Sequence, residues 1–159
     1  MVMQRHVRLV EELKDAAKRD SVRIAFATTD LRHVDQHFGS AERFAIYEVD
    51  AEQSRLLEVA EFGARKQDGN EDKLLEKFVL VEACAAVYSL AIGPSAVRQL
   101  MGLGVQPIRV PEHSTINALL SGLQHEMQEG PGGWLARSLS AKGKDEERFD
   151  SMLQEQWEE

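Results

Sequence analysis

Cysteine and basic residues are both scarce in this sequence of 159 residues, and each shortage excludes a class of function. Cys84 is the single cysteine, which excludes an intramolecular disulfide and any metal site built from several thiolates of one chain. Lysine and arginine total 19 against 27 acidic residues, for a formal net charge of -8. Because nucleic-acid binding requires a basic face, this balance argues against DNA or RNA as a partner.

Long apolar runs are also absent. No apolar stretch approaches the roughly 18 residues that span a bilayer, and residues 1–20 carry too many charges for a secretory signal. We therefore expect a cytoplasmic protein with no membrane partner, whose length suits one ordinary domain.

The alternation of strand and helix patterns predicts one α/β domain. Segments rich in apolar and β-branched residues, bounded by turns, predict strands. These segments are 22–27, 42–50, 54–62, 85–93 and 105–110. Asn70, Pro94 and Ser114 are residue types that begin helices. The resulting order predicts a single mixed sheet of about five strands with helices on both faces, in which Pro107 marks the last strand as an edge strand.

Apolar spacing predicts which helical side chains are buried. For the first two helices the expected buried residues are Leu74, Leu75 and Phe78, then Val97, Leu100 and Met101. For the third helix they are Ile116, Leu119, Leu120, Leu123 and Met127. Gly104 is expected at the C-terminal end of the second helix.

Both ends of the chain are expected to lie outside the main domain, residues 21–128. Residues 1–20 have the pattern of an amphipathic N-terminal extension. The sequence Gly-Pro-Gly-Gly at 130–133 predicts a hinge, so residues 129–159 are expected to form a hinge and an acidic helical tail outside the core. In that tail Phe149, Leu153 and Trp157 recur every fourth residue and require an apolar surface, in this domain or in a partner.

Two connections are candidates for a ligand site. In open α/β sheets the binding crevice lies beyond the C-terminal ends of the parallel strands. The loop after strand 22–27 carries His37, and Gly93-Pro94-Ser95 leads from strand 85–93 into a helix N-terminus, which favours anions. If these strands are neighbours, the two connections meet over one crevice.

Each candidate residue also has a purely structural interpretation. His37 could stabilise a turn, and Gly39 could be required only for its backbone angles. Arg43 could form a salt bridge at a strand edge, and Cys84 could be a small buried residue of the core. Ser40 lies three residues from His37, but no third group or nucleophile elbow accompanies them, which argues against a hydrolase triad.

Three stretches, 26–50, 61–88 and 92–110, resemble the dinitrogenase iron-molybdenum cofactor biosynthesis family. The resemblance is collinear over roughly residues 21–128. The pattern H-F-G-x-x-x-x-F, from His37 to Phe44, belongs to the broad family, which includes NafY/NifY and the C-terminal domain of NifB. The run QDGNEDKL at 67–74 and Cys84 are most similar to its NifX members.

This resemblance implies a ribonuclease-H-like topology and a carrier that performs no catalysis. Such a carrier binds, transfers or transiently stores the iron-sulfur precursor of the iron-molybdenum cofactor, and in some members the finished cofactor. Its implied partners are the cluster-synthesising donor NifB and the scaffold NifEN. The resemblance places metal contact at His37. We consider Cys84 as a second metal ligand and Gly39, Ser40, Arg43, Gly93 and Ser95 as the surrounding cofactor-binding residues.

Two rival functions remain open. A nuclease, which the implied topology invites, would need several carboxylates around divalent ions, one of them on the first strand, and strand 22–27 contains none. The other rival is a protein-protein interaction module of nitrogenase assembly that binds no cluster.

Overall fold

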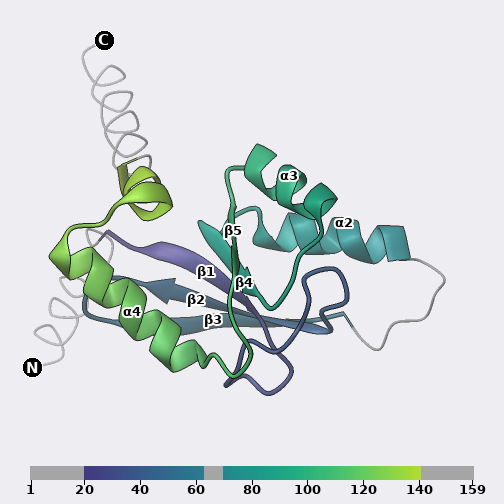
Figure 1. The fold of residues 1–159 in the computed structure, drawn as a ribbon, viewed down its shortest axis with the longest axis horizontal. Coiled ribbons are helices and arrows are strands. Elements are labelled where there is room, and N and C mark those ends of the chain that lie inside the picture. The colour runs from purple at the N-terminus through teal and green to yellow at the C-terminus, as the bar shows by residue number, and fades with distance from the viewer. Residues whose placement is uncertain (1–19, 63–69, 141–159) are drawn as a thin grey trace, which may run out of the picture.

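The computed structural model describes residues 20–62 and 70–140, and these form a sheet flanked by helices (Figure 1). The elements in chain order are β1 (Val22–Ala27), β2 (Arg43–Val49), β3 (Ser54–Glu61), α2 (Asn70–Val81), β4 (Ala86–Ser89), α3 (Pro94–Gly102), β5 (Gln106–Arg109) and α4 (Ile116–Glu129). A further helical segment covers residues 133–140. No helix among the described residues is long and apolar enough to cross a membrane.

The five strands form one mixed sheet in the order β3-β2-β1-β4-β5. Strand β1 pairs with β2 in antiparallel and with β4 in parallel orientation, and β5 continues the parallel half beside β4. Only β2 therefore runs against the other four strands. This order and these directions are those of the ribonuclease-H-like topology and confirm the predicted fold class.

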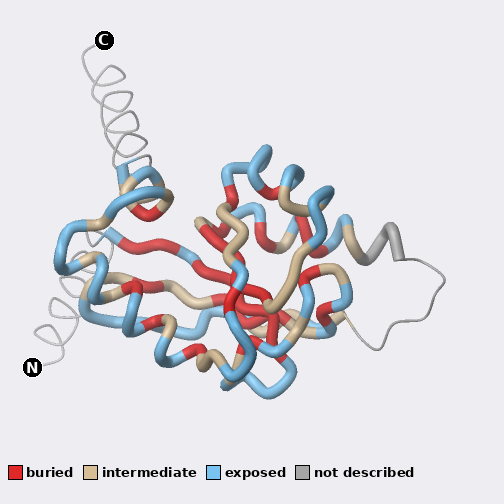
Figure 2. Tube along the Cα trace, in the orientation of Figure 1, coloured by how far each residue is buried: buried red, intermediate tan, exposed pale blue. Residues whose placement is uncertain are grey.

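Helices cover both faces of the sheet, and a hydrophobic cluster fills each interface (Figure 2). On one face, side chains from β1 pack against Ile116, Leu120 and Leu123 of α4. On the other face, β1, β2 and β4 pack against Phe78 and Val81 of α2 and Leu100 of α3. Strand β1 contributes to both clusters because successive side chains point to opposite faces.

Strand β5 is an edge strand, as Pro107 predicted. The amides of Gln106 and Val110 bond back to the chain that contains β4. Because successive backbone groups of a strand point in alternate directions, the backbone nitrogen of residue 107 points away from β4, toward the open edge of the sheet. Proline has no N–H at this position, so it offers no donor to a further strand.

Two side chains expected in the core are instead exposed. Leu75 is 63% exposed and Met101 57% exposed. Residues 74, 77, 78 and 81 share the inner face of α2 at helical spacing, so Leu75 projects to the other side and Lys77 takes a buried position. Met101 lies in the last turn of α3, one residue beyond buried Leu100 and therefore about 100° around the helix.

The start of α4 and the segment after it also differ from expectation. Thr115, not Ser114, is the N-cap, because its hydroxyl accepts a hydrogen bond from the Ala118 amide. Residues from 134 onward were expected outside the core, yet Leu135 is fully buried in the cluster beneath α4. The glycines at 130 and 133 have positive φ angles, which turn the chain back onto the sheet instead of releasing it.

Several expectations concern residues outside the described ranges. These are the N-terminal extension, most of the run at 67–74 and the stripe Phe149, Leu153 and Trp157.

Candidate cofactor-binding site

The parallel pairing of β1 with β4 brings the His37 loop against the connection that follows β4. His37 forms a parallel bridge with Ala91. The Phe38 amide donates to the Ala91 carbonyl at 2.9 Å, and the Leu90 amide donates to the Gln36 carbonyl at 3.0 Å. The two predicted connections therefore meet at one edge of the sheet, beyond the C-terminal end of β4.

Buried side chains anchor the His37 loop while His37 itself remains exposed. Val34 and Phe38 are fully buried. The Phe38 ring lies 5.7 Å from that of Phe44 and 5.5 Å from that of Phe78, between the loop, β2 and α2. Because residue 38 is fixed by this packing and by its hydrogen bond, the backbone that carries His37 is fixed as well.

The acidic residues of the loop are used to shape it. Asp35 accepts hydrogen bonds from the amide and hydroxyl of Thr29. Asp30 accepts from the amides of Arg32 and His33 and lies 2.7 Å from Nδ1 of His33. The hydrogen bond from the His33 side chain is the main reason why the pKa of Asp30 is well below its ordinary value. Both carboxylates therefore act as turn formers.

A cleft of about 540 Å³ opens beside His37. It is lined by His37, Leu90, Ala91, Arg109, Val110, Pro111 and Glu112. Arg109 ends β5 and donates through Nε to the Leu90 carbonyl at 3.2 Å, which holds its guanidinium at the cleft. The cleft thus combines one imidazole, one guanidinium and one carboxylate on an otherwise apolar and backbone lining.

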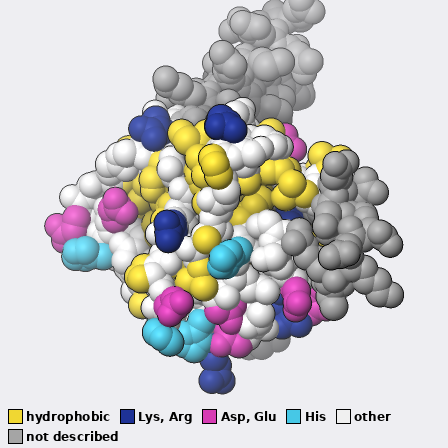
Figure 3. Space-filling view, turned by 45° about the vertical axis from the view of Figure 1, so that its right-hand side comes forward, with side chains coloured by type: hydrophobic (Ala, Val, Ile, Leu, Met, Phe, Trp, Pro, Cys, Tyr) yellow, Lys and Arg dark blue, Asp and Glu magenta, His cyan; other side chains and the backbone are white. Residues whose placement is uncertain are grey.

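Histidine and acidic side chains lie close together on the lower part of one face of the molecule, with hydrophobic patches above them (Figure 3).

The exposed large hydrophobic residues of α2 and α3, the two helices on one side of the sheet, are Leu75 and Val79 of α2 and Met101 of α3, and Leu103 follows α3.

The predicted residues Gly39, Ser40 and Arg43 lie near His37 but outside the cleft lining. The Gly39 carbonyl accepts a hydrogen bond from the buried Lys77 Nζ at 2.8 Å. Ser40 is exposed. Arg43 donates to the Thr29 carbonyl at 2.6 Å and forms an ion pair with Glu61 at 2.8 Å, so its structural interpretation as a strand-edge salt bridge fits the geometry.

Gly93 and Ser95 mark the N-terminus of α3, a short distance along the chain from Ala91. Gly93 is the N-cap and its carbonyl accepts from the Val97 amide. Pro94 has no N–H, so the amides of Ser95 and Ala96 are the ones directed away from the helix. This terminus favours negative charge on the side of the sheet where Phe38 packs.

Cys84 lies at the other end of β4 from His37. It precedes the strand, while Ala91, the bridge partner of His37, follows it. Seven residues of extended chain correspond to about 20 Å, so these two side chains do not share a metal site, contrary to our expectation of a common ligand set. Burial raises the pKa of the Cys84 thiol to about 11, which suits a core residue.

Two buried polar atoms lack a hydrogen-bond partner within the described part of the chain: Nε of Arg43 and the hydroxyl of Ser89. Ser89 is the last residue of β4, directly before the cleft residue Leu90. No group of three or more His, Cys, Asp and Glu side chains suited to a metal ion occurs among residues 20–62 and 70–140.

Comparison with known families gives a match to the family described as dinitrogenase iron-molybdenum cofactor over residues 20–126. The chain belongs to this family. The match covers nearly the same range as the resemblance found in the sequence, roughly 21–128. Membership associates the chain with nitrogen fixation and with the biosynthesis of the iron-molybdenum cofactor.

Similar proteins within the iron-molybdenum cofactor family include Protein NifX of Azotobacter vinelandii, which is 53% identical over 87% of this chain and 88% of its own length. Protein NifX of Klebsiella pneumoniae is 35% identical over 86% of this chain and 83% of its own length. Among solved structures, the crystal structure of PH0822 covers 65% of this chain and 88% of its own, with a TM-score of 0.50 and 22% identity. That structure supports the fold alone.

Sequence reasoning missed two residues of the candidate site, Arg109 and Lys77. Arg109 was part of an expected strand, and only the pairing of β5 with β4 places it beside the His37 loop. Lys77 lies three residues after Leu74 and four before Val81, so it shares their face of α2. This helical spacing was the available signal that Lys77 points inward.

Proposed function

We propose that the chain binds the iron-sulfur precursor of the iron-molybdenum cofactor at the His37 cleft and passes it to other assembly proteins as a carrier, without catalysing a reaction. The observation that carries this proposal is the exposed imidazole of His37 on a rigid backbone beside a cleft that also receives the Arg109 guanidinium. Family membership supports the identity of the cargo.

The residues of the cleft suit a bulky, anionic metal cluster. A neutral imidazole nitrogen is an iron ligand, and a guanidinium compensates negative charge without binding metal. The amides at the start of α3 add positive potential near the His37 loop. Glu112 also lines the cleft, and its negative charge weakens the binding of an anionic cargo.

A carrier is expected to supply only a small number of ligands to the cluster. A permanent iron-sulfur cluster is held by about four thiolates, whereas His37 offers one nitrogen and Cys84 lies beyond its reach. Loose binding permits release to the next protein. The donor of the cluster in this proposal is NifB and the recipient is the NifEN scaffold, and the finished cofactor is a second possible cargo of the same site.

The test is anaerobic mixing of the full-length protein with the isolated precursor, followed by gel filtration with iron analysis and absorbance. We expect iron to elute with the wild type and to be lost from His37→Ala. Arg109→Gln should retain less iron than the wild type because it removes the fixed positive charge. His125→Ala, an exposed histidine of α4, is the matched control and should bind like the wild type.

A protein-protein interaction module is the second candidate function. The observation that favours it is the exposed apolar pair on α2, Leu75 and Val79, which lie one turn apart and are 63% and 64% exposed. No iron with any variant, together with loss of binding to assembly proteins in a Leu75→Ser and Val79→Ser double variant, would favour the module over the carrier.

A further inference from the structure

A second pocket lies far from the His37 cleft, at the other end of the parallel strands. Its volume is about 320 Å³. It is lined by Ala85, Met101, Gly104, Val105, Gln106, Trp134, Arg137 and Ser138. Gln106 is the first residue of β5 and Arg109 of the His37 cleft is the last, so the two cavities open at opposite ends of that strand.

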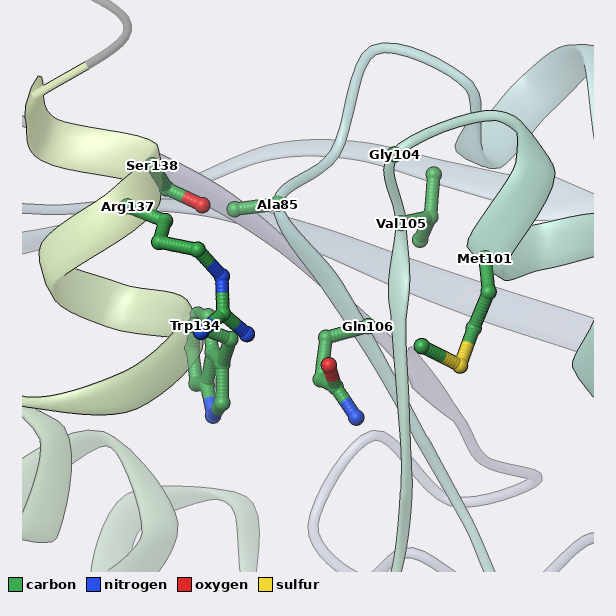
Figure 4. Close-up of a pocket in the computed structure, with 8 residues that line it drawn as sticks. All are labelled: Ala85, Met101, Gly104, Val105, Gln106, Trp134, Arg137 and Ser138. Carbon is green, nitrogen blue, oxygen red and sulfur yellow. The ribbon is translucent and has the colours of Figure 1, made fainter.

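The walls of this pocket combine an apolar body with a few polar groups. Trp134, Arg137 and Ser138 project from one helical segment, and Gln106 and Met101 lie across from them (Figure 4). Residues 134, 137 and 138 share one helix face because they are three and four positions apart. Buried Leu135 holds that helix against the core, which fixes the direction of this face.

Two polar side chains of the pocket make few contacts with the described residues. Within the described part of the chain, the Arg137 guanidinium has no hydrogen bond or ion pair, although the net charge of the protein is -8. The Gln106 side-chain nitrogen makes one long hydrogen bond, 3.3 Å, to the carbonyl of its neighbour Pro107, and its side-chain oxygen accepts no hydrogen bond from residues 20–62 or 70–140. A guanidinium recognises a carboxylate through two parallel hydrogen bonds.

We propose that this pocket binds a small organic acid. Its carboxylate pairs with Arg137, and its apolar part lies between the Trp134 ring and the Met101 side chain. The volume is at the lower end of the range for small-molecule sites, which suits a small ligand. The net negative charge of the protein repels anions, and the positive charge of Arg137 offsets this repulsion within the pocket.

The test titrates 3-phenylpropionate into the full-length protein and follows the emission of Trp134. Trp157→Phe is the background for all measurements because it leaves Trp134 as the only tryptophan. We expect a saturable change that 3-phenylpropanol, which has the same body without the carboxylate, does not produce. Arg137→Gln should weaken binding about tenfold or more, the usual effect of losing a charged hydrogen-bonding partner.

Arg98→Gln, an exposed arginine of α3 outside the pocket, is the matched control and should bind like the background protein. His37→Ala should also bind the acid unchanged, which separates this pocket from the cluster site. Equal affinity in Arg137→Gln, equal binding of the alcohol, or no saturable change in emission would each overturn the proposal. Thermal unfolding of each variant, with midpoints like that of the background protein, verifies that the substitutions leave the fold intact.

Discussion

Replacing Phe38 by leucine tests whether buried packing positions His37. Phe38 is fully buried, with ring contacts to Phe44 at 5.7 Å and Phe78 at 5.5 Å. Truncation to alanine at such a site costs about 3–5 kcal/mol, a large part of a total stability of about 5–15 kcal/mol. Leucine keeps most of the apolar volume but loses two aromatic pairs of about 0.5–1.5 kcal/mol each, so we expect a loss of about 1–3 kcal/mol.

The assay pairs urea unfolding with amide hydrogen exchange and iron retention. Phe44→Leu is the matched variant, because Phe44 is also fully buried and also has two aromatic partners, Phe38 and Phe62. We expect similar losses in the free energy of unfolding. Only Phe38→Leu should speed exchange of the amide at position 38, which bonds to the Ala91 carbonyl, and weaken cluster binding beyond the effect of Phe44→Leu.

One result would refute this reasoning. If the two variants lose the same stability but keep equal exchange at position 38 and equal iron, then Phe38 contributes to the core without positioning His37. The backbone bonds of the loop to residues 90 and 91 would then suffice on their own.

The remaining predictions concern one core residue, one cap and one ion pair. Because burial raises the pKa of Cys84 from 9.0 to about 11, its neutral form stabilises the fold fully below pH 9, and this contribution is lost as the pH rises toward 11. Urea unfolding of wild type and Cys84→Ala at pH 8 and 10.5 should therefore show a steeper loss for the wild type, and equal losses would contradict the burial argument. Thr115→Ala should cost about 1 kcal/mol of unfolding free energy as the loss of an N-cap, and Ser114→Ala less; the reverse order would restore Ser114 as the cap. Glu61→Gln, which breaks the ion pair with partly exposed Arg43, should change stability by about 1 kcal/mol or less, and a larger loss in urea unfolding would show that the pair supports the sheet edge more than its exposure suggests.

Local patterns were sufficient for most of the fold. Helix α4 followed from the period of its apolar residues, and three of them, Ile116, Leu120 and Leu123, are buried as expected. Pro107 indicated that the last strand lies at an edge of the sheet, and β5 does. These features depend on residues close together in the chain, which act before any distant contact forms.

The candidate site was predictable in part. The position of His37 in a loop after the first strand, and of Gly93 after the fourth, indicated that the two connections would meet if their strands were neighbours. The family resemblance, now confirmed, added the interpretation of the histidine as a metal contact and the proposed class of cargo. Whether His37 binds metal stays a prediction.

The tertiary structure decided which distant residues share a surface. The sequence alone determined the strand and helix order, the scarcity of thiolates and the family. Only the packing of β5 beside β4 brought Arg109 to the His37 cleft, and only the length of β4 separated Cys84 from it. Likewise, the sequence showed that the glycine-rich segment 130–133 ends a helix, but it did not show whether Leu135 is buried. Leu135 packs on apolar surface beneath α4, and this surface forms only when the sheet and the helix are assembled.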